Sequence, residues 1–435
     1  MSNQGQWLLG FIHQARCAGL PLTQAVAAAG VLRLKLALAI DEQGRPLSVT
    51  IQPKISPSVS GFATTPRFIV SYEGCNDLTT KDEETLNALV RLLAQMESSF
   101  PSDFSESLGV FDAATSKEER FIALYPFCRV ERAYVDGKPS QEILIRTTPH
   151  CNQACPFCSA PPTKNVPEAT LLRALNAAAK LFPDSDVTLT GGEPTLRPSF
   201  VAEVQYALAL SNFARVVVQT NATRFARTIA PVNLPAHERL HFFVSLHALT
   251  PHTYDRITGT QHQMELACSG ISRLLAAGHT LTLNAVICRH NVHELDTYVT
   301  TIAKRFASHD RLDLHFSTLL CPEGKACDDL LIPHQEAIVA MAKASSLAKD
   351  LGITMQSLRS STYASPPVCI VPKELRGPSP RRLAQHVETL DLHAWVKGPN
   401  CHLCQEYDTC LGVTDVYAKS FGLDEFVPLT TNEFL

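Results

Sequence analysis

The sequence lacks an excess of charge of either sign. Its 435 residues include 38 Lys plus Arg against 42 Asp plus Glu, which gives a formal net charge of −4. A broad basic surface of the kind that attracts nucleic acid or an anionic membrane is therefore not expected. We predict no nucleic-acid partner.

Long hydrophobic runs and a basic leader are also lacking. The apolar stretch 20–34 is too short to span a bilayer, and no cluster of positive charge precedes it. We therefore predict no signal peptide, no membrane association and a cytoplasmic location. Without an export signal, disulfides are a poor explanation for the 14 cysteines, because disulfides persist in oxidising compartments. Thiolate ligation of a metal explains seven of them better.

What the chain does contain is a cysteine triplet, Cys151, Cys155 and Cys158, directly after the strand-like run 142–147. A [4Fe–4S] cube is normally held by four thiolates, so three would leave one iron open to a substrate or cofactor. A zinc site is the alternative. Zinc sites usually offer paired Cys-x2-Cys units, which this spacing does not match.

The Cys-x3-Cys-x2-Cys spacing, with Phe157 before the third cysteine, resembles the signature of the radical S-adenosylmethionine (SAM) enzymes. The resemblance implies that the open iron chelates the amino and carboxylate groups of SAM. One electron would then split the sulfonium to give a 5′-deoxyadenosyl radical. A [4Fe–4S] cluster and SAM are thus the implied cofactors, and a flavodoxin or ferredoxin is the implied reductant. The cofactor would supply the difficult chemistry and the protein its positioning.

Strand-like and helical segments alternate after the triplet. Strands are predicted at 186–190, 215–220, 240–249, 280–288 and 312–320, and helices at 168–182, 265–277 and 292–306. This alternation implies a parallel sheet with right-handed crossovers. Together with the strand before the cysteines, six strands would make a partial (β/α)6 radical SAM barrel, so the predicted fold class is α/β.

Polar or glycine-rich residues end these strands, at the edge where parallel α/β sheets collect ligands. The second strand ends in Gly191, Gly192, Glu193 and Pro194, which resembles the family motif that binds the methionine amine of SAM. The glycine pair lets backbone approach a ligand closely, and Glu193 can accept a hydrogen bond from an ammonium group. An ordinary turn is the alternative.

The same resemblance makes four further residues candidate SAM ligands: Asn221, Ser245, His247 and Asn291. Asn221 would lie near the ribose, and Ser245 would contact the methionine carboxylate. His247 falls on the same side of its strand as Ser245, with a buried core histidine as the alternative. The two asparagines have a helix cap as their alternative. The sequence assigns no catalytic base or hydrogen donor.

A second cysteine set follows the predicted barrel: Cys369, Cys401, Cys404 and Cys410. Four thiolates can saturate a [4Fe–4S] cube or hold one zinc ion, and spacing does not separate the two. The tail resembles the auxiliary-cluster extensions of radical SAM enzymes, above all shortened peptide-maturase (SPASM/twitch-like) domains. We predict a second [4Fe–4S] cluster, with zinc as the alternative. Cys369 is the least constrained ligand, since Cys321 or Cys327 could replace it.

The remaining cysteines are scattered, and most are expected to be small buried apolar residues. They are Cys17, Cys75, Cys128, Cys268, Cys288, Cys321 and Cys327.

The N-terminal part is predicted to be a small α+β unit. Segments 33–40 and 47–51 form a hairpin around the turn 41–45, a third strand is expected at 67–72, and a capping box at 80–83 opens a helix. This unit could dock a peptide substrate, or pack against and shield the barrel. The predicted domains are the α+β domain at 1–140, the barrel at 141–345 and a cysteine-rich auxiliary-cluster extension at 346–435.

We therefore expect an enzyme that cleaves SAM reductively and abstracts hydrogen from a substrate, preferably a ribosomally made peptide or protein. Biosynthesis of a cofactor or small metabolite is the alternative within the enzyme class. Resemblance to the molybdenum-cofactor cyclase is weaker, because the terminal residues 432–435 lack that enzyme's Gly-Gly. Fold analogy does not choose among these substrates. The second hypothesis is a non-catalytic protein that relays electrons or donates iron–sulfur units.

Overall fold

The structure is a computed structural model. It describes residues 11, 14–15, 18–20, 22–28, 31–36, 47–53, 63–64, 68–73, 80–96, 117–125, 127–135, 138–158, 165–306, 310–321, 327–356, 358, 365–376, 395–407 and 410–430.

The chain divides into two compact units. The first comprises residues 1–129 with 387–390, and the second comprises residues 130–386 with 391–435. The three-domain division at 140 and 345 stays a prediction.

The first unit contains an antiparallel sheet with the strand order β1-β2-β3-β5-β4. Its elements are β1 (Leu22–Ala28), β2 (Val31–Leu36), β3 (Leu47–Pro53), β4 (Ala63–Thr64), β5 (Phe68–Glu73), α2 (Thr80–Met96) and α3 (Lys117–Leu124). The predicted pairing of β2 with β3 is confirmed, with Leu36 opposite Leu47. The turn 41–45 and the side chains of the capping box lie outside the described residues. The helix α2 buries an apolar stripe that includes Leu86, Leu89 and Leu93.

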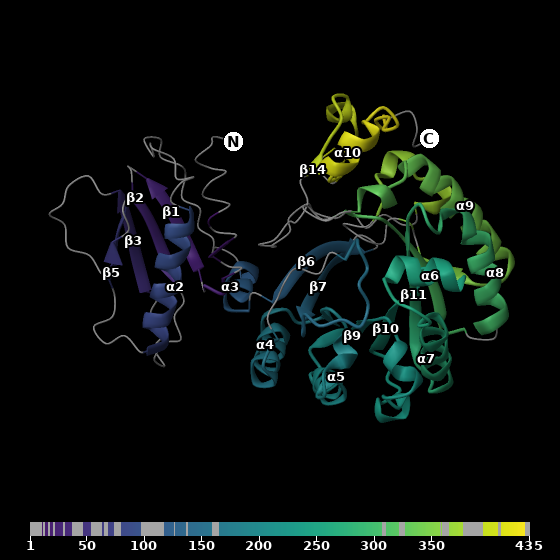
Figure 1. The fold of residues 1–435 in the computed structure, drawn as a ribbon, viewed down its shortest axis with the longest axis horizontal. Helices are drawn as coiled ribbons and strands as arrows, with labels where there is room; N and C mark the ends of the chain where they lie inside the picture. The colour runs from purple at the N-terminus through teal and green to yellow at the C-terminus, as the bar shows by residue number, and fades with distance from the viewer. Residues whose placement is uncertain are drawn as a thin grey trace. The chain divides into compact units, whose positions relative to one another are not determined.

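The second unit is built on an eight-stranded sheet in the order β13-β12-β11-β10-β9-β8-β7-β6 (Figure 1). Its strands are β6 (Cys128–Val135), β7 (Lys138–Arg146), β8 (Ser185–Thr190), β9 (Phe213–Thr220), β10 (Leu240–Ser245), β11 (Thr280–Ile287), β12 (Leu312–Thr318) and β13 (Thr354–Met355). Neighbours from β7 to β13 pair in parallel. The six predicted barrel strands are β7 to β12, and the predicted α/β partial barrel is confirmed.

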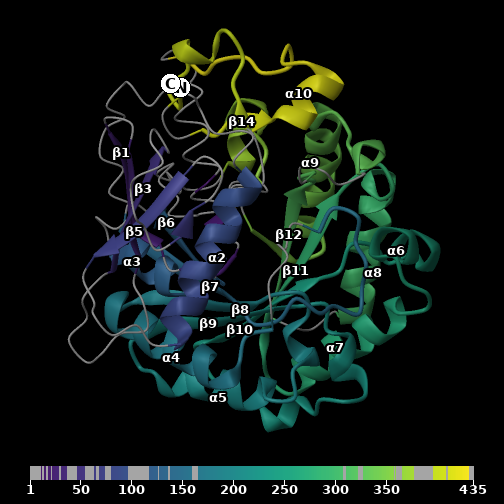
Figure 2. The ribbon, with the colours of Figure 1, turned by 60° about the vertical axis from the view of Figure 1, so that its left-hand side comes forward.

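Helices surround the outside of this curved sheet (Figure 2). They are α4 (Glu168–Leu181), α5 (Phe200–Ala209), α6 (Pro251–Thr258), α7 (Met264–Ala276), α8 (Leu295–Phe306) and α9 (His334–Asp350). Strand β10 shows how the core forms: Phe242 and Val244 are fully buried, whereas the alternate residues Phe243 and Ser245 are half-buried. Because side chains alternate across a strand, the apolar set packs under the helices and the other set lines the inner face.

Two differences from the predicted elements have local causes. Strand β10 ends at Ser245 rather than at 249, because the chain leaves the sheet and begins α6 at Pro251. The predicted helix 292–306 begins with a 3-10 turn, Val292–Glu294, before α8. The end of α7 is as predicted: Gly278 has a φ of +89°, and its N–H donates to Leu275 O.

The C-terminal part consists of short elements. They are η7 (Val368–Ile370), η8 (Lys373–Leu375), β14 (Trp395–Val396), η9 (Cys401–Leu403), β15 (Val413–Thr414) and α10 (Asp415–Phe421). Side chains from this part cap the start of α9. Tyr417 Oη accepts from the backbone N–H of His334 at 2.6 Å, and Glu425 accepts from that of Gln335 at 2.8 Å.

No helix among the described residues has both the length and the apolar composition needed to cross a membrane.

Candidate functional site

The cysteine triplet lies on the loop that follows β7, at the carboxyl edge of the sheet. Cys151 is exposed, and Cys155 and Cys158 are half-buried. The α6 segment holds the middle of this loop: Ala154 N–H donates to Thr258 O at 2.8 Å, and the Gln153 side chain donates to Tyr254 Oη at 2.8 Å. The loop is therefore fixed between its first two cysteines.

A second attachment comes from the residues that follow β9. Asn221 Nδ2 donates to Asn152 Oδ1 at 2.8 Å, and Asn152 Nδ2 donates to Thr223 Oγ1 at 2.9 Å. Asn221 Oδ1 also accepts from Thr223 N–H at 3.1 Å. Asn221 thus forms a local side-chain contact with Thr223 and holds the cysteine loop, whereas the 3-10 turn Thr223–Ala226 has Ala222 at its N-cap and no side-chain cap. Its contact with SAM stays a prediction.

The Gly191-Gly192 pair lies directly against the start of the cysteine loop. Gly192 N–H donates to Thr148 O at 2.6 Å, and the next residue, Glu193, donates its N–H to His150 O at 2.7 Å. A Cβ atom at Gly192 would lie 2.2 Å from His150 O, and one at Gly191, whose φ is +150°, would lie 2.5 Å from Thr148 O. The close approach that requires glycine is therefore an approach to the cysteine loop.

The Glu193 carboxylate is almost completely buried, at 1% exposure, and it joins the ends of β8 and β9. Its Oε1 accepts three hydrogen bonds, from Thr195 N–H, Thr195 Oγ1 and Thr220 Oγ1. Its Oε2 accepts one hydrogen bond from the described residues, from Asn221 N–H. Burial raises the pKa of this carboxyl group, and the four donors oppose that rise. A carboxylate oxygen can accept two hydrogen bonds, so Oε2 retains capacity for an ammonium donor.

Asn291 is buried, and its side chain joins the ends of β10 and β11. Its Nδ2 donates to His247 O at 2.8 Å and to Val286 O at 2.9 Å, and its Oδ1 accepts from Cys288 N–H at 2.8 Å. No side-chain cap is formed at Asn291 for the 3-10 turn that follows it. A role as a SAM ligand stays a prediction, as it does for the half-buried Ser245.

His247 is buried, at 4% exposure, and its Nδ1 accepts from Val286 N–H at 3.2 Å. Its ring meets Phe157 edge to face, with 5.4 Å between ring centroids. Burial lowers the pKa of His247 to about 4, so the ring is neutral near pH 7. This histidine has the core environment given as its alternative, and it also contacts the aromatic residue of the cysteine motif.

Two of the triplet thiols, Cys151 and Cys155, have a raised pKa. Burial, together with the neighbouring thiols Cys158 and Cys151, raises the pKa of Cys155 to about 12. Burial also raises the pKa of Cys151, and the nearby Glu193 and Cys158 contribute to that rise. Three thiolates thus repel one another on this loop, and a cationic centre would remove that penalty.

The second cysteine set converges on one cavity. Cys369, Cys401, Cys404 and Cys410 all line a space of about 460 Å³ that is partly open to solvent, with apolar walls that include Val413 and Phe426. Burial raises the pKa of Cys369 to about 12, and the other three thiols add to the rise. Cys369, the least constrained ligand of the predicted set, thus lies beside the same cavity as the other three cysteines.

Both cysteine sets fit an iron–sulfur cluster by donor chemistry, since thiolates are the ligands of such clusters. In the described part of the chain, no group of three or more His, Cys, Asp or Glu side chains is arranged around a single metal ion, so both cluster assignments rest on the donor chemistry of the thiols. Cys151, Cys155 and Cys158 would hold the first cluster, and the cavity cysteines the second. Both assignments stay predictions.

One expectation about the other cysteines needs correction. Cys321 and Cys327 form a disulfide with each other after β12, so neither competes with Cys369 for a ligand position. They are buried but are not free thiols. Cys268 and Cys288 are buried free thiols, as expected, and burial raises the pKa of both.

Sequence reasoning missed several residues that hold the cysteine loop in place. Gln153 and Asn152 lie between the cysteines, and their amide side chains, which must hydrogen-bond when half-buried, were the available signal. Arg197 was also missed, although a buried arginine needs acceptors and a carboxylate.

Residues 145–301 match the family model described as the Radical SAM superfamily. This match identifies residues 145–301 as a radical SAM region. Its similarity to curated proteins is partial: it is 32% identical over 162 residues to "PqqA peptide cyclase" of Ruegeria pomeroyi, covering 35% of this chain and 41% of that protein. It is 31% identical over 182 residues to "Mycofactocin maturase MftC" of Mycobacterium tuberculosis, covering 41% and 44%.

A third relative is "GTP 3',8-cyclase" of Haemophilus influenzae, 26% identical over 185 residues, which covers 40% of this chain and 54% of that protein. The matched regions thus span about half the length of the curated relatives. A solved structure titled "Native anSMEcpe with bound AdoMet" is similar over 66% of this chain and 92% of that one, with 13% identity and a TM-score of 0.46.

Proposed function

We propose that this radical SAM protein is an enzyme that cleaves SAM reductively and abstracts hydrogen from a ribosomally made peptide. One observation carries the proposal. The cysteine loop, the Gly191–Pro194 motif and Asn221 come from the ends of three parallel strands and are joined by hydrogen bonds at one edge of the sheet. A metal-binding loop and a cofactor-binding motif in direct contact are what this chemistry needs.

When bound, a [4Fe–4S] cluster and SAM would supply the electron transfer and the adenosyl radical. The chain's own residues position these groups. Cys151, Cys155 and Cys158 would hold three irons and leave the fourth for SAM. Glu193 Oε2 has the remaining capacity to accept from the methionine ammonium group.

Aromatic and apolar residues exclude water from one side of the triplet. Phe157 is 9% exposed, and the neutral His247 ring packs against it. Packed rings that exclude water beside the triplet would protect a reactive radical from side reactions. His247 would thus act through Phe157 and not as an acid.

The C-terminal cavity supports a second cluster. Four thiols line it, and none of the other wall residues shares their affinity for soft metals. We assign this site to an auxiliary [4Fe–4S] cluster that relays electrons or stabilises the extension. A flavodoxin or ferredoxin is proposed as the external reductant.

The peptide substrate is proposed because a relative with 32% identity is named for a peptide cyclase reaction. The similarity to a GTP 3',8-cyclase favours a second candidate, the biosynthesis of a cofactor or small metabolite. A non-catalytic electron relay or assembly protein remains a third hypothesis, and it predicts no SAM turnover.

Anaerobic reconstitution of the full chain with iron and sulfide tests the proposal. We expect about eight irons per chain, as two four-iron cubes require, and 5′-deoxyadenosine after dithionite and SAM are added. About four irons together with bound zinc would reassign the C-terminal site to structural zinc. Eight irons without deoxyadenosine would favour the relay hypothesis and refute the enzyme.

A further inference from the structure

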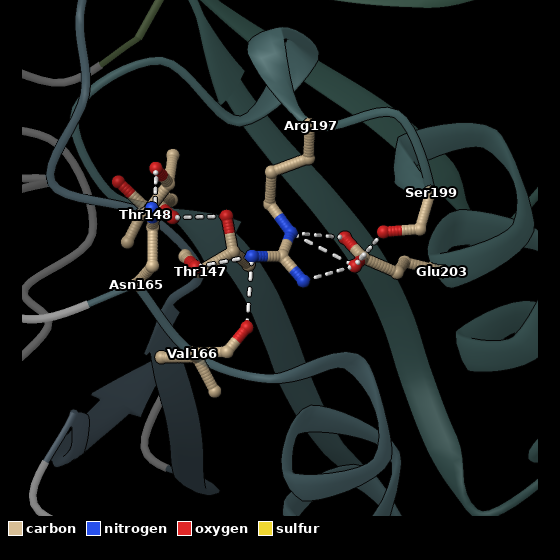
Figure 3. A network of polar contacts seen from close by, with 8 residues as sticks. Thr147, Thr148, Asn165, Val166, Arg197, Ser199 and Glu203 are labelled. Carbon is tan, nitrogen blue, oxygen red and sulfur yellow. Dashed lines mark hydrogen bonds and ion pairs between the residues drawn. The ribbon is translucent and has the colours of Figure 1, made fainter.

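A buried arginine lies at the base of the cysteine loop. Arg197 follows the Gly191–Pro194 motif, and its guanidinium group donates to two backbone carbonyls, Thr147 O and Val166 O, each at 2.9 Å through Nη1 (Figure 3). The same group makes a bidentate contact with Glu203 through Nε and Nη2, at 2.8 Å and 2.6 Å to Oε1. One planar cation therefore reaches three separate parts of the chain.

The two carbonyls belong to the two ends of the segment that carries the triplet. Thr147 comes directly after β7, and Val166 comes just before α4. Every triplet cysteine lies between them. Closing a flexible loop costs conformational entropy. A contact that joins the ends of the loop offsets this cost during folding, so that it no longer opposes the binding of a ligand. Arg197 makes such a contact.

Charge and burial make this contact strong. The side chain of Arg197 is 10% exposed and that of Glu203 is 1% exposed. Ser199 Oγ also donates to Glu203 Oε1, at 2.7 Å. The carboxylate holds the guanidinium plane in the orientation that aims Nη1 at the two carbonyls. A lysine could not reproduce this geometry, because its ammonium group is a point charge without a rigid fork of donors.

A second cross-link lies closer to the cysteines. Thr148 Oγ1 donates to Asn165 Oδ1 at 2.9 Å, and Asn165 Nδ2 lies 3.0 Å from His150 Nε2. Thr148 Oγ1 also accepts from His150 N–H at 3.2 Å. Thr148 and Asn165 are one residue inside Thr147 and Val166, so the two cross-links are consecutive layers across the same loop base.

We propose that these two layers, Arg197 with Glu203 and Thr148 with Asn165, are a clasp that closes the cysteine loop and slows iron loss from the triplet. The inference rests on the proposed function, because it takes the triplet as the ligand set. Arg197 and Thr148 act as positioning residues through the loop backbone. They are placed neither on the cofactor nor on the reacting atoms.

Arg239 provides a matched control for Arg197. It is also part-buried in the same sheet unit and donates to the carbonyls of Phe213 at 2.9 Å and Leu210 at 3.2 Å, but these join α5 to β9. Its removal should therefore cost folding stability without affecting the triplet. A purely structural role for Arg197 predicts that Arg197→Met and Arg239→Met behave alike.

The experiment uses the reconstituted full chain and measures iron release to a chelator, thermal unfolding, and the electron paramagnetic resonance spectrum after dithionite with and without SAM. We expect Arg197→Met to release triplet iron about tenfold faster than the wild type, as is typical when outer partners of metal ligands are removed. Arg239→Met should release iron at the wild-type rate. Cys155→Ala identifies which iron and which SAM-sensitive signal belong to the triplet.

The second layer keeps the test valid if Arg197→Met does not fold. Thr148→Val removes the hydroxyl and should speed iron release, and Thr148→Ser should restore the wild-type rate. Wild-type release rates in folded Arg197→Met, or in Thr148→Val if that variant alone folds, would overturn the clasp while leaving the proposed function intact. If Cys155→Ala matched the wild type in iron content and spectrum, the proposed function itself would fail, and the clasp with it.

Discussion

The two cysteine sites of this molecule are built in different ways. The triplet loop is held by hydrogen bonds from segments far away in the sequence, among them Gly192, Asn221 and Thr258. The C-terminal cavity is lined mainly by apolar walls, and the backbone bonds at its cysteines are mostly local, such as Cys404 N–H to Cys401 O. Among the described residues of this part, the regular elements are only two or three residues long, apart from α10.

The difference shows what each site depends on. A large parallel sheet fixes the triplet loop, so the fold does not need metal to define that loop. The described residues of the C-terminal part form mostly short elements, and small domains built of such elements usually depend on metal or disulfides for stability. Metal binding there should contribute to folding, whereas metal binding at the triplet should serve chemistry.

Replacing one cysteine in each site should give the largest difference in SAM cleavage between the two sites. Cys155→Ala is expected to abolish SAM cleavage, because an iron ligand is lost beside the open iron. Cys401→Ala should leave the triplet cluster and its SAM-sensitive resonance signal in place. Iron analysis and a 5′-deoxyadenosine assay check both variants. Retained cleavage in Cys155→Ala would refute the assignment of the triplet.

Replacing one glycine by alanine in each site compares the tight packing of the first site with the looser packing of the second. Gly192→Ala would place Cβ 2.2 Å from His150 O, and backbone atoms on both sides cannot easily yield. We expect a destabilisation of about 3 kcal/mol, at the upper end for overpacking. At Gly398 the nearest atom to a Cβ, Cys401 Sγ, is 3.6 Å away, so Gly398→Ala should be tolerated.

Chemical denaturation of both glycine variants measures this difference. Equal loss of stability in the two would show that the cysteine loop can move away from the Gly191-Gly192 pair. It would thereby remove the contrast between the sites.

Replacing the buried carboxylate should have a smaller effect, confined to the first site. Glu193→Gln places an amide NH2 among four hydrogen-bond donors, so at least one buried donor loses its acceptor. We expect a loss of about 1–3 kcal/mol in folding stability and weaker SAM binding by a similar amount. Isothermal titration with SAM measures the second quantity. An unchanged affinity would mean that Gly-Gly-Glu-Pro acts only as a turn.

Acidification should weaken the packing of the C-terminal part on the start of α9. The loss of folding stability should be small near neutral pH. Burial lowers the pKa of His334 to about 3, and its ring stacks on Tyr417 with 4.2 Å between centroids. Below about pH 6.5 the unfolded chain binds a proton that the folded chain does not, so this stability is lost between about pH 6.5 and pH 3. His334→Phe should reduce the loss.

Unfolding curves at pH 7 and pH 5 check this prediction, with the exposed His252→Phe as the control. The wild type and the His252 variant should lose stability alike over this interval. If the His334 variant lost as much as they do, the histidine would not be the group responsible.

Several features of the fold could be predicted from the sequence because they depend on local patterns. The buried run at β8 and the apolar spacing of α4 were evident from periodicity, and the end of α7 from Gly278. The strand-end position of Glu193 followed from the same pattern. The pairing of Cys321 with Cys327 was not foreseen, because spacing does not tell which thiols meet.

The clasp could not be predicted either, because sequence spacing does not show which side chains and carbonyl groups meet. Nothing near Arg197 in the sequence indicates that its acceptors are Thr147 and Val166, which lie on either side of the triplet. The two glycines were expected to approach a ligand, and which surface they approach depends on the register between β7 and β8. Such contacts are set by the sheet and not by neighbouring residues.

By itself, the sequence determined the alternation of strands and helices and the donor chemistry of the two cysteine sets, since periodicity and residue type are local properties. Only the tertiary structure decided which partners these residues have. It brought Cys369 to the same cavity as Cys401, and it joined Gly192, Asn221 and Thr258 to the triplet loop. Parallel strands place their ends at one edge whatever their separation along the chain, and that edge is where the proposed chemistry is assembled.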